Sequence, residues 1–236
     1  MSKIVNVFTS PAEAFEGIGS LPSKTSSWLF PFLAAFVISV LIAYLLVSNE
    51  ALRAQVVDQQ AKAMQKMVDS GRMTQEQADA SISRMESMGG GMFLVFGTLG
   101  SLVFLCAYYF GGSLFLWLTG KIALKSTAGY GKYLELYGMS AWVGVLGAII
   151  TVLLMVGLSS LFASPSAALA ILSEYDATND THKYLSALNI FSVWQASVVG
   201  IGLSKLTGKS IGMSMGVSFG LWVVWVILSV LVGIAR

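Results

Sequence analysis

Residues 184–236 read YLSALNIFSVWQASVVGIGLSKLTGKSIGMSMGVSFGLWVVWVILSVLVGIAR, and this stretch decides the fold class. Lys183 and Lys205 enclose 21 uncharged residues, and Lys209 and Arg236 enclose 26 more. A helix needs about 20 apolar residues to cross the hydrocarbon core of a bilayer. The stretch therefore predicts two membrane-spanning helices joined by a short basic turn.

The rest of the chain supplies three more segments of this kind, so we predict an all-α bundle of five membrane-spanning helices. The composition agrees, because 56% of the residues are hydrophobic and only 11% are charged, whereas soluble chains carry about 25% charged residues. The first 27 residues (1–27) precede a membrane domain over 28–236. The predicted spans are residues 28–47, 92–119, 136–162, 185–204 and 211–234.

Two segments outside the spans show helical signals. Ser10-Pro11-Ala12-Glu13 combines an N-cap residue, a proline at the first helical position and a glutamate three residues after the cap. This short helix is expected either at the bilayer interface or docked onto the bundle. Residues 49–91 carry five basic and six acidic side chains, and Thr74 to Gln77 forms a capping box. We expect a helical hairpin outside the bilayer here.

Small residues recur at helical spacing in two predicted spans. The fifth span has Gly212, Gly216 and Gly220, and the third has Ser140, Gly144 and Ala148. Residues four apart share one helix face, and a face of small residues lets two helix backbones approach closely. We expect the glycine face to pack on the third span; the alternative is the same face of a second copy, in a homo-oligomer.

Three polar residues fall within or beside the predicted spans. Asn189 and Gln195 lie in the fourth, where an amide seeks an interhelical partner; packing is the expected role and ligand recognition the alternative. Glu135 precedes the third span, where the helix dipole favours a carboxylate. We expect interfacial capping there, and the alternative is a functional ionisable group.

The residue inventory argues against several kinds of chemistry. The chain has one cysteine and one histidine, Cys106 and His182, which exclude a Cys/His zinc site within one chain. Its formal charge of +2 argues against a nucleic-acid surface. No phosphate-binding glycine loop, nucleophile elbow or metal-ligand cluster is present. We therefore expect no catalytic residue, cofactor or metal.

The distribution of lysines predicts the orientation. Placing the N-terminus in the cytoplasm puts seven lysines inside: Lys3, Lys24, Lys121, Lys125, Lys132, Lys205 and Lys209. The short outer segments then hold Lys183 and Arg236, while the 49–91 segment is long and balanced in charge. We predict a cytoplasmic N-terminus and an outer C-terminus.

Five predicted spans follow a short first helix, and the fourth contains the stretch Asn189-Ile190-Phe191-Ser192-Val193-Trp194, which leads to Gly202-Leu203. In these features the chain resembles the Yip1 family, over about residues 8–232. The opening Phe8-x-x-Pro11-x-x-x-Phe15 and the segment Gly129-Tyr130-Gly131-Lys132-Tyr133 are similar to bacterial members.

Eukaryotic Yip1 proteins are implicated in vesicle traffic and associate with Rab GTPases through a long N-terminal region with an Asp-Leu-Tyr-Gly-Pro motif. The 27-residue segment here lacks that motif, so the resemblance implies a bacterial inner-membrane homologue without a Rab-type GTPase partner. We expect a non-enzymatic scaffold or adaptor that contacts the bilayer and, through residues 49–91, membrane or envelope proteins. The alternative is a transporter or channel for small solutes or lipids, in monomeric or oligomeric form.

Overall fold

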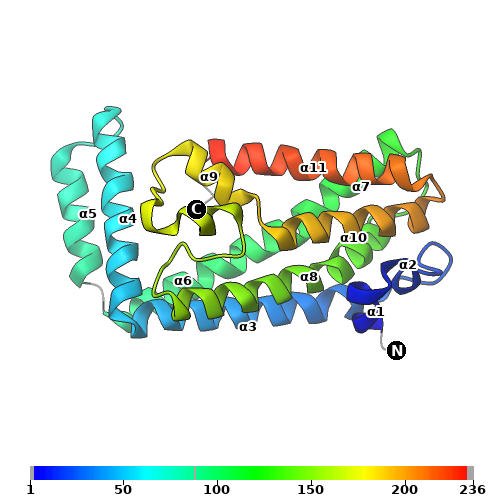
Figure 1. The fold of residues 1–236 in the computed structure, drawn as a ribbon, viewed down its shortest axis with the longest axis horizontal. Helices are drawn as coiled ribbons and strands as arrows, with labels where there is room; N and C mark the ends of the chain where they lie inside the picture. The colour runs from blue at the N-terminus through cyan, green and yellow to red at the C-terminus, as the bar shows by residue number, and fades with distance from the viewer. Residues whose placement is uncertain (1–2, 88, 233–236) are drawn as a thin grey trace.

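The computed structural model describes residues 3–87 and 89–232, and this part of the chain is all-α, as predicted (Figure 1). Five helical segments are long and apolar enough to cross a membrane: α3 (Ser26–Ser48), the continuous segment Gly90–Ala123, α8 (Tyr130–Gly157), α10 (Ile190–Thr207) and α11 (Ile211–Leu231). The second segment consists of α6 (Gly90–Cys106), the π-helix η1 (Ala107–Gly111) and α7 (Gly112–Ala123). The predicted span end at 234 and Arg236 lie outside the described residues.

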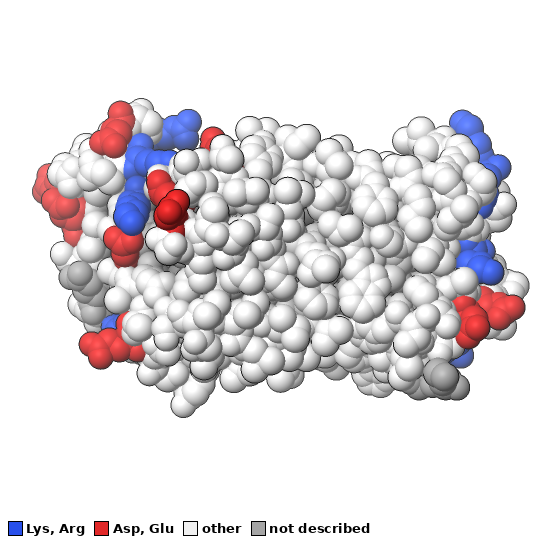
Figure 2. Space-filling model, in the orientation of Figure 1, with Lys and Arg blue, Asp and Glu red and all other residues white. Residues whose placement is uncertain are grey.

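Charge is distributed along the bundle as a membrane protein requires. Figure 2 shows Lys, Arg, Asp and Glu gathered at the two ends of the molecule, with an uncharged surface between them. Large apolar side chains point outward on that surface, such as Val103, which is 69% exposed, and Leu153, which is 62% exposed. Lipid solvates such side chains at no cost, so the uncharged belt is the part that lies in the bilayer.

The third and fourth spans differ from their predicted bounds. α8 begins at Tyr130 rather than at 136 and ends at Gly157 rather than at 162. α10 begins at Ile190 rather than at 185, because the preceding helix ends at Ala187 and Asn189 caps the new one: its Oδ1 accepts a hydrogen bond from the Phe191 N–H at 2.9 Å. An asparagine side chain competes in this way with a continuous helix.

The predicted α10–α11 hairpin is confirmed. Gly208 ends α10 with a φ of +69°, a left-handed conformation that glycine adopts without steric cost. The Ser210 hydroxyl then caps α11 by accepting from the Met213 N–H at 3.4 Å. The two helices lie side by side along the upper part of Figure 1.

α8 is the central helix, since it packs against α3, α7 and α10. Glycines allow its closest crossings. A Cβ added to Gly138 would overlap Trp28 of α3, and one added to Gly147 would lie 2.7 Å from the Cβ of Phe191 in α10. Close backbone approach is the main source of helix association in lipid.

The prediction that Gly212, Gly216 and Gly220 pack on the third span is wrong. All three are exposed, and a Cβ at any of them would have no neighbour within 4 Å. α11 contacts α10 instead through the opposite face, where Ser218 Oγ donates to the Ala196 carbonyl at 2.6 Å. Residues two apart on a helix point in nearly opposite directions, so Ser218 lies on one face of α11 and the three glycines lie on the opposite face.

The small-residue stripe of α8 faces α10. Ser140 is buried and its hydroxyl donates to the Tyr137 carbonyl at 2.7 Å. A Cβ at Gly144 would lie 2.9 Å from Gln195 Oε1 of α10. The stripe therefore serves helix packing, with α10 and not α11 as its partner.

The N-terminal segment docks onto one end of the bundle, which is the second of the two expected arrangements. It forms α1 (Lys3–Thr9) and α2 (Pro11–Ala14), with Pro11 at the start of α2 as predicted. Val7 and Phe15 are fully buried in the core cluster that α8 and α10 also supply. Phe8 packs edge-on against Trp194, with ring centroids 5.8 Å apart.

Residues 50–87 form the expected extramembrane hairpin, α4 (Glu50–Asp69) and α5 (Gln75–Ser87). The capping box is confirmed: the Thr74 N–H donates to Gln77 Oε1 at 3.1 Å, and the Gln77 N–H donates to Thr74 Oγ1 at 3.2 Å. Among the larger element contacts of the described residues, those of α5 are with α4 alone. The hairpin stands at the end of the bundle opposite α1 (Figure 1).

The segment between α8 and α10 connects the bundle to this hairpin. It contains the 3₁₀-helix η2 (Ala167–Glu174) and α9 (Asp180–Ala187). Lys66 of α4 donates to the Thr178 carbonyl at 2.8 Å, and His182 Nδ1 accepts from the Asp176 N–H at 2.9 Å. Hydrogen bonds from the Thr178 N–H and hydroxyl lower the pKa of the Asp176 carboxyl.

Gln55 of α4 adds a second link to the bundle. Its Nε2 donates to the Ser159 carbonyl at 2.8 Å, and its Oε1 accepts from the Leu161 N–H at 2.8 Å. Both linked residues follow the end of α8, so the hairpin is held directly on the central helix of the bundle.

Candidate functional site

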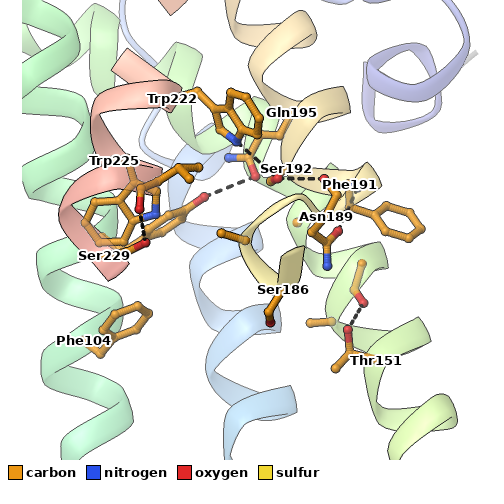
Figure 3. A pocket seen from close by; sticks show the side chains of 16 residues that line it. Phe104, Thr151, Ser186, Asn189, Phe191, Ser192, Gln195, Trp222, Trp225 and Ser229 are labelled. Atoms are coloured by element: carbon orange, nitrogen blue, oxygen red, sulfur yellow. Dashed lines mark hydrogen bonds between the residues drawn. The ribbon is translucent and has the colours of Figure 1, made fainter. Parts of the chain in front are cut away.

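A cavity of about 360 Å³ lies among α6, η1, α8, α9, α10 and α11 (Figure 3). Its size is at the lower end of the range of about 300–1,000 Å³ for small-molecule sites. The lining residues are Phe104, Tyr108, Gly144, Gly147, Ala148, Thr151, Ser186, Ala187, Asn189, Phe191, Ser192, Gln195, Trp222, Trp225, Val226 and Ser229.

The start of α10 forms one wall of the cavity. Asn189 caps the helix, and Ser192 donates to the Asn189 carbonyl at 2.7 Å. The same Ser192 oxygen accepts from the indole N–H of Trp222 in α11 at 3.2 Å. The polar groups at this end are thus fixed between two spans, as Figure 3 shows.

Gln195 lies one turn deeper and is 7% exposed. Its Oε1 accepts a hydrogen bond from the Tyr108 hydroxyl at 3.2 Å. Tyr108 belongs to the π-helix η1, whose wider turn changes the direction of the side chains that follow α6. A tyrosine and a glutamine from different spans therefore meet inside the bundle.

The close crossing that places Tyr108 depends on Gly112, where a Cβ would lie 2.7 Å from the ring of Tyr137. Tyr137 also packs on Tyr108, with ring centroids 5.5 Å apart. Gly112 thus allows the second span to approach α8 at the level of the cavity, whereas a Cβ at Gly111 would have no neighbour within 4 Å.

The cavity is amphipathic and uncharged. Five aromatic residues supply most of its apolar wall: Phe104, Tyr108, Phe191, Trp222 and Trp225. Hydroxyl, amide and indole groups supply the polar part, and the described residues of the lining include no Asp, Glu, Lys, Arg, His or Cys. This wall suits a molecule with an apolar body and a few uncharged polar atoms.

One end of the cavity is closed by the protein core. The lining residues of α8 and α10 are Gly144 to Thr151 and Asn189 to Gln195. Towards the end of the bundle where α1 lies, α8 and α10 carry fully buried side chains, among them Leu136 and Leu203. The space therefore does not continue along the bundle towards α1.

The side of the cavity is open between α6 and α11. Phe104 of α6 is 47% exposed and Trp225 of α11 is 43% exposed, although both line the cavity. Figure 3 shows them on one side, with Asn189 and Thr151 opposite. Both residues belong to segments that are apolar enough to cross a membrane, so we expect this side of the cavity to face lipid.

Glu135 lies away from the cavity, and its expected capping role is wrong. It falls in the second turn of α8, because that helix starts at Tyr130. The carboxylate is buried, where it binds Lys132 Nζ at 2.9 Å and accepts from the Ser27 hydroxyl at 3.3 Å. The pair joins the start of α8 to the start of α3.

Four of the candidate residues meet at the cavity: Gly144, Ala148, Asn189 and Gln195. Ser140 and Glu135 lie nearer the other end of α8, and the three glycines of α11 face outward. Sequence reasoning missed Tyr108, Trp222 and Trp225. These residues could have been found from the sequence, because each is a Tyr or Trp deep within an apolar segment. The O–H or N–H group of such a side chain needs a hydrogen-bond partner inside the bundle.

One of three comparisons with known proteins gives a match. A comparison with curated proteins and one with solved structures gave no match. The family model described as the Yip1 domain matches residues 5–234, which is nearly the whole chain. The chain with this five-span bundle therefore belongs to the Yip1 domain family, and it is an integral membrane protein.

Proposed function

We propose that this protein is a non-enzymatic membrane scaffold that binds an amphipathic molecule of the bilayer in the cavity beside Gln195. The observation that carries the proposal is the uncharged, aromatic wall with fixed amides and hydroxyls, open to the lipid on one side. Such a wall supports binding and orientation. It offers no nucleophile paired with a base and no metal ligands among the described lining residues.

Lipid retention tests this proposal. Ala148 lines the cavity, and the next residue, Ile149, is 43% exposed on the outer face of α8. Ala148→Phe fills the cavity, whereas Ile149→Phe places a ring of the same size in lipid. Mass spectrometry of the lipids that remain with the gently purified protein should show one species lost in Ala148→Phe and kept in Ile149→Phe. Equal lipid content in both variants would refute binding in the cavity.

The adaptor part of the proposal rests on the hairpin. α4 is fixed to the bundle through Gln55 and Lys66, while α5 packs on α4. Because α4 is fixed to the bundle and α5 faces solvent, the hairpin suits contact with a membrane or envelope protein. A photoreactive residue at Glu76 should crosslink one reproducible partner. Pull-down after chemical crosslinking should recover that partner with the full chain and not with a chain that lacks residues 49–91. Failure to recover any partner counts against the adaptor role.

Transport is the alternative function, and Gln195 and Asn189 are the residues to test for it. The closed end of the cavity favours binding over passage through one chain. Solute or lipid flux in proteoliposomes that is lost on replacing either amide would favour the transporter.

The location proposed is the inner membrane of a bacterium, with the N-terminus in the cytoplasm. Six of the seven lysines predicted inside lie at or beyond the ends of spans at the α1 end of the bundle, and Lys132 pairs with Glu135 there. The hairpin then lies outside, at the end of the bundle opposite α1.

A further inference from the structure

We infer that the cavity selects a neutral lipid through uncharged oxygen acceptors, that is, through carbonyl oxygens of a glycerol ester or of a quinone ring. The inference rests on the proposed function, because it names the ligand class of the same site. It follows from an inventory of the hydrogen-bond donors and acceptors that the wall still has free.

Four hydroxyl protons of the wall are already used in hydrogen bonds. Thr151 donates to the Gly147 carbonyl at 2.9 Å, Ser229 donates to the Val226 carbonyl at 2.8 Å, and Ser192 donates to Asn189. The Tyr108 proton goes to Gln195 Oε1. A ligand that needs hydroxyl donors therefore finds few here.

The nitrogen donors are different. Within the described residues, no hydrogen bond is made by Gln195 Nε2, Asn189 Nδ2 or the indole nitrogen of Trp225. The oxygens of both amides already accept, from Tyr108 and from the Phe191 N–H. These contacts leave the NH₂ groups as the free ends of the two side chains. The described residues of the wall thus offer free N–H groups that a ligand oxygen can satisfy.

The absence of charge on the described lining residues restricts the class of ligand further. A phosphate or carboxylate placed among these residues would lose its water without gaining a cation, because the described lining residues carry no charge. Burial of an unpaired ion costs far more than burial of a hydrogen-bonded carbonyl. Neutral carbonyl oxygens satisfy the free N–H groups without that cost.

The opening and the volume of the cavity also agree with a neutral lipid as its ligand. The opening between Phe104 and Trp225 faces hydrocarbon, so the ligand arrives from the bilayer. A cavity of about 360 Å³ holds one end of a lipid while its chains remain outside. The carbonyl end then lies at Gln195 and the tail passes between α6 and α11.

Native mass spectrometry of the full-length protein tests the inference with three probes: dioleoylglycerol, a short-tailed benzoquinone lipid and dioleoylphosphatidylglycerol. The expected result is saturable binding of at least one of the two neutral carbonyl probes, and which of them binds identifies the source. Ala148→Phe should abolish this binding. Preference of the cavity for the phosphate lipid would overturn the inference.

Variants at the free donors provide the second arm. Gln195→Met keeps the length of the side chain and removes its N–H groups, so binding of the neutral probe should weaken by about fivefold or more. Trp225→Phe removes the indole N–H at a half-exposed position, where folding is least affected. Ser197→Ala is the control, since Ser197 lies outside the cavity and bonds only to the Val193 carbonyl.

The outcomes separate this inference from the proposed function. If Ala148→Phe loses a native lipid whose binding is insensitive to both donor variants, cavity binding stands and the carbonyl assignment is wrong. If Ala148→Phe loses nothing, the proposed function itself is wrong. Should Gln195→Met fail to fold, unchanged probe binding by Trp225→Phe would overturn the inference alone.

Discussion

Replacement of Gly147 by alanine should destabilise the protein, whereas the same replacement at Gly216 should not. A Cβ at Gly147 would lie 2.7 Å from the Phe191 Cβ and 2.8 Å from its Cγ. Carbon atoms in good contact are about 3.5–4.0 Å apart, so α8 and α10 must separate or Phe191 must shift by roughly 1 Å. Such overpacking costs about 1–3 kcal/mol.

Alanine also favours a helix over glycine by up to about 1 kcal/mol, which offsets part of this cost. Two carbon atoms of Phe191 lie within 2.8 Å of the added Cβ, so the overpacking cost falls in the upper part of that range, about 2–3 kcal/mol. The net loss for Gly147→Ala is therefore about 1–2 kcal/mol. At about 2–4 °C per kcal/mol for a chain of this size, the melting temperature should fall by about 2–8 °C. Gly216 has no neighbour within 4 Å of its Cβ position, so Gly216→Ala should leave the melting temperature unchanged or raise it slightly.

Thermal unfolding in one detergent, followed by tryptophan fluorescence, measures both variants. A crosslinking gel run in parallel reports dimers, because the outward glycine face remains the predicted contact for a second copy. Equal melting temperatures for Gly147→Ala and the wild type would refute the packing argument. A loss of stability in monomeric Gly216→Ala would show that the glycine face has an internal partner after all.

Three further predictions concern charge and orientation. Cysteines placed in residues 49–91 should react with a membrane-impermeant thiol reagent in intact cells; labelling confined to residues 121–132 would invert the proposed topology. Glu135→Leu should destabilise the protein by about 3–5 kcal/mol because it leaves Lys132 charged and largely buried, and Lys132→Met in the same chain should recover much of the loss; a double variant as unstable as the single one would contradict this reading. The lowered pKa of Asp176 means that its contribution to stability is present above the ordinary value of 3.8 and is lost as the pH falls through the lower folded value. The protection of the loop amides, measured as hydrogen exchange relative to the intrinsic rate at each pH, should therefore fall below that pH, and unchanged protection there would exclude the role of the carboxylate.

The membrane class and the five spans followed from the sequence alone. Long uncharged segments between lysines have one stable solution in a bilayer, because every backbone group must be satisfied within the helix. The hairpin was also predictable, since the Thr74–Gln77 capping box and the mixed charges act through neighbours three or four residues apart. Local interactions of this kind do not depend on the rest of the fold.

The cavity and the true packing faces were decided by tertiary structure. Spacing marked Gly212, Gly216 and Gly220 as a flat face, but in lipid both faces of α11 are equally apolar and nothing in its own sequence tells which one meets a neighbour. The serine face met α10 instead. Likewise, the Tyr108–Gln195 contact joins residues 87 positions apart and depends on the π-turn of η1 and on the space left at Gly112 and Gly144. Helix periodicity determines which residues share a face, whereas only the mutual fit of whole helices determines which faces touch and where a space remains between them.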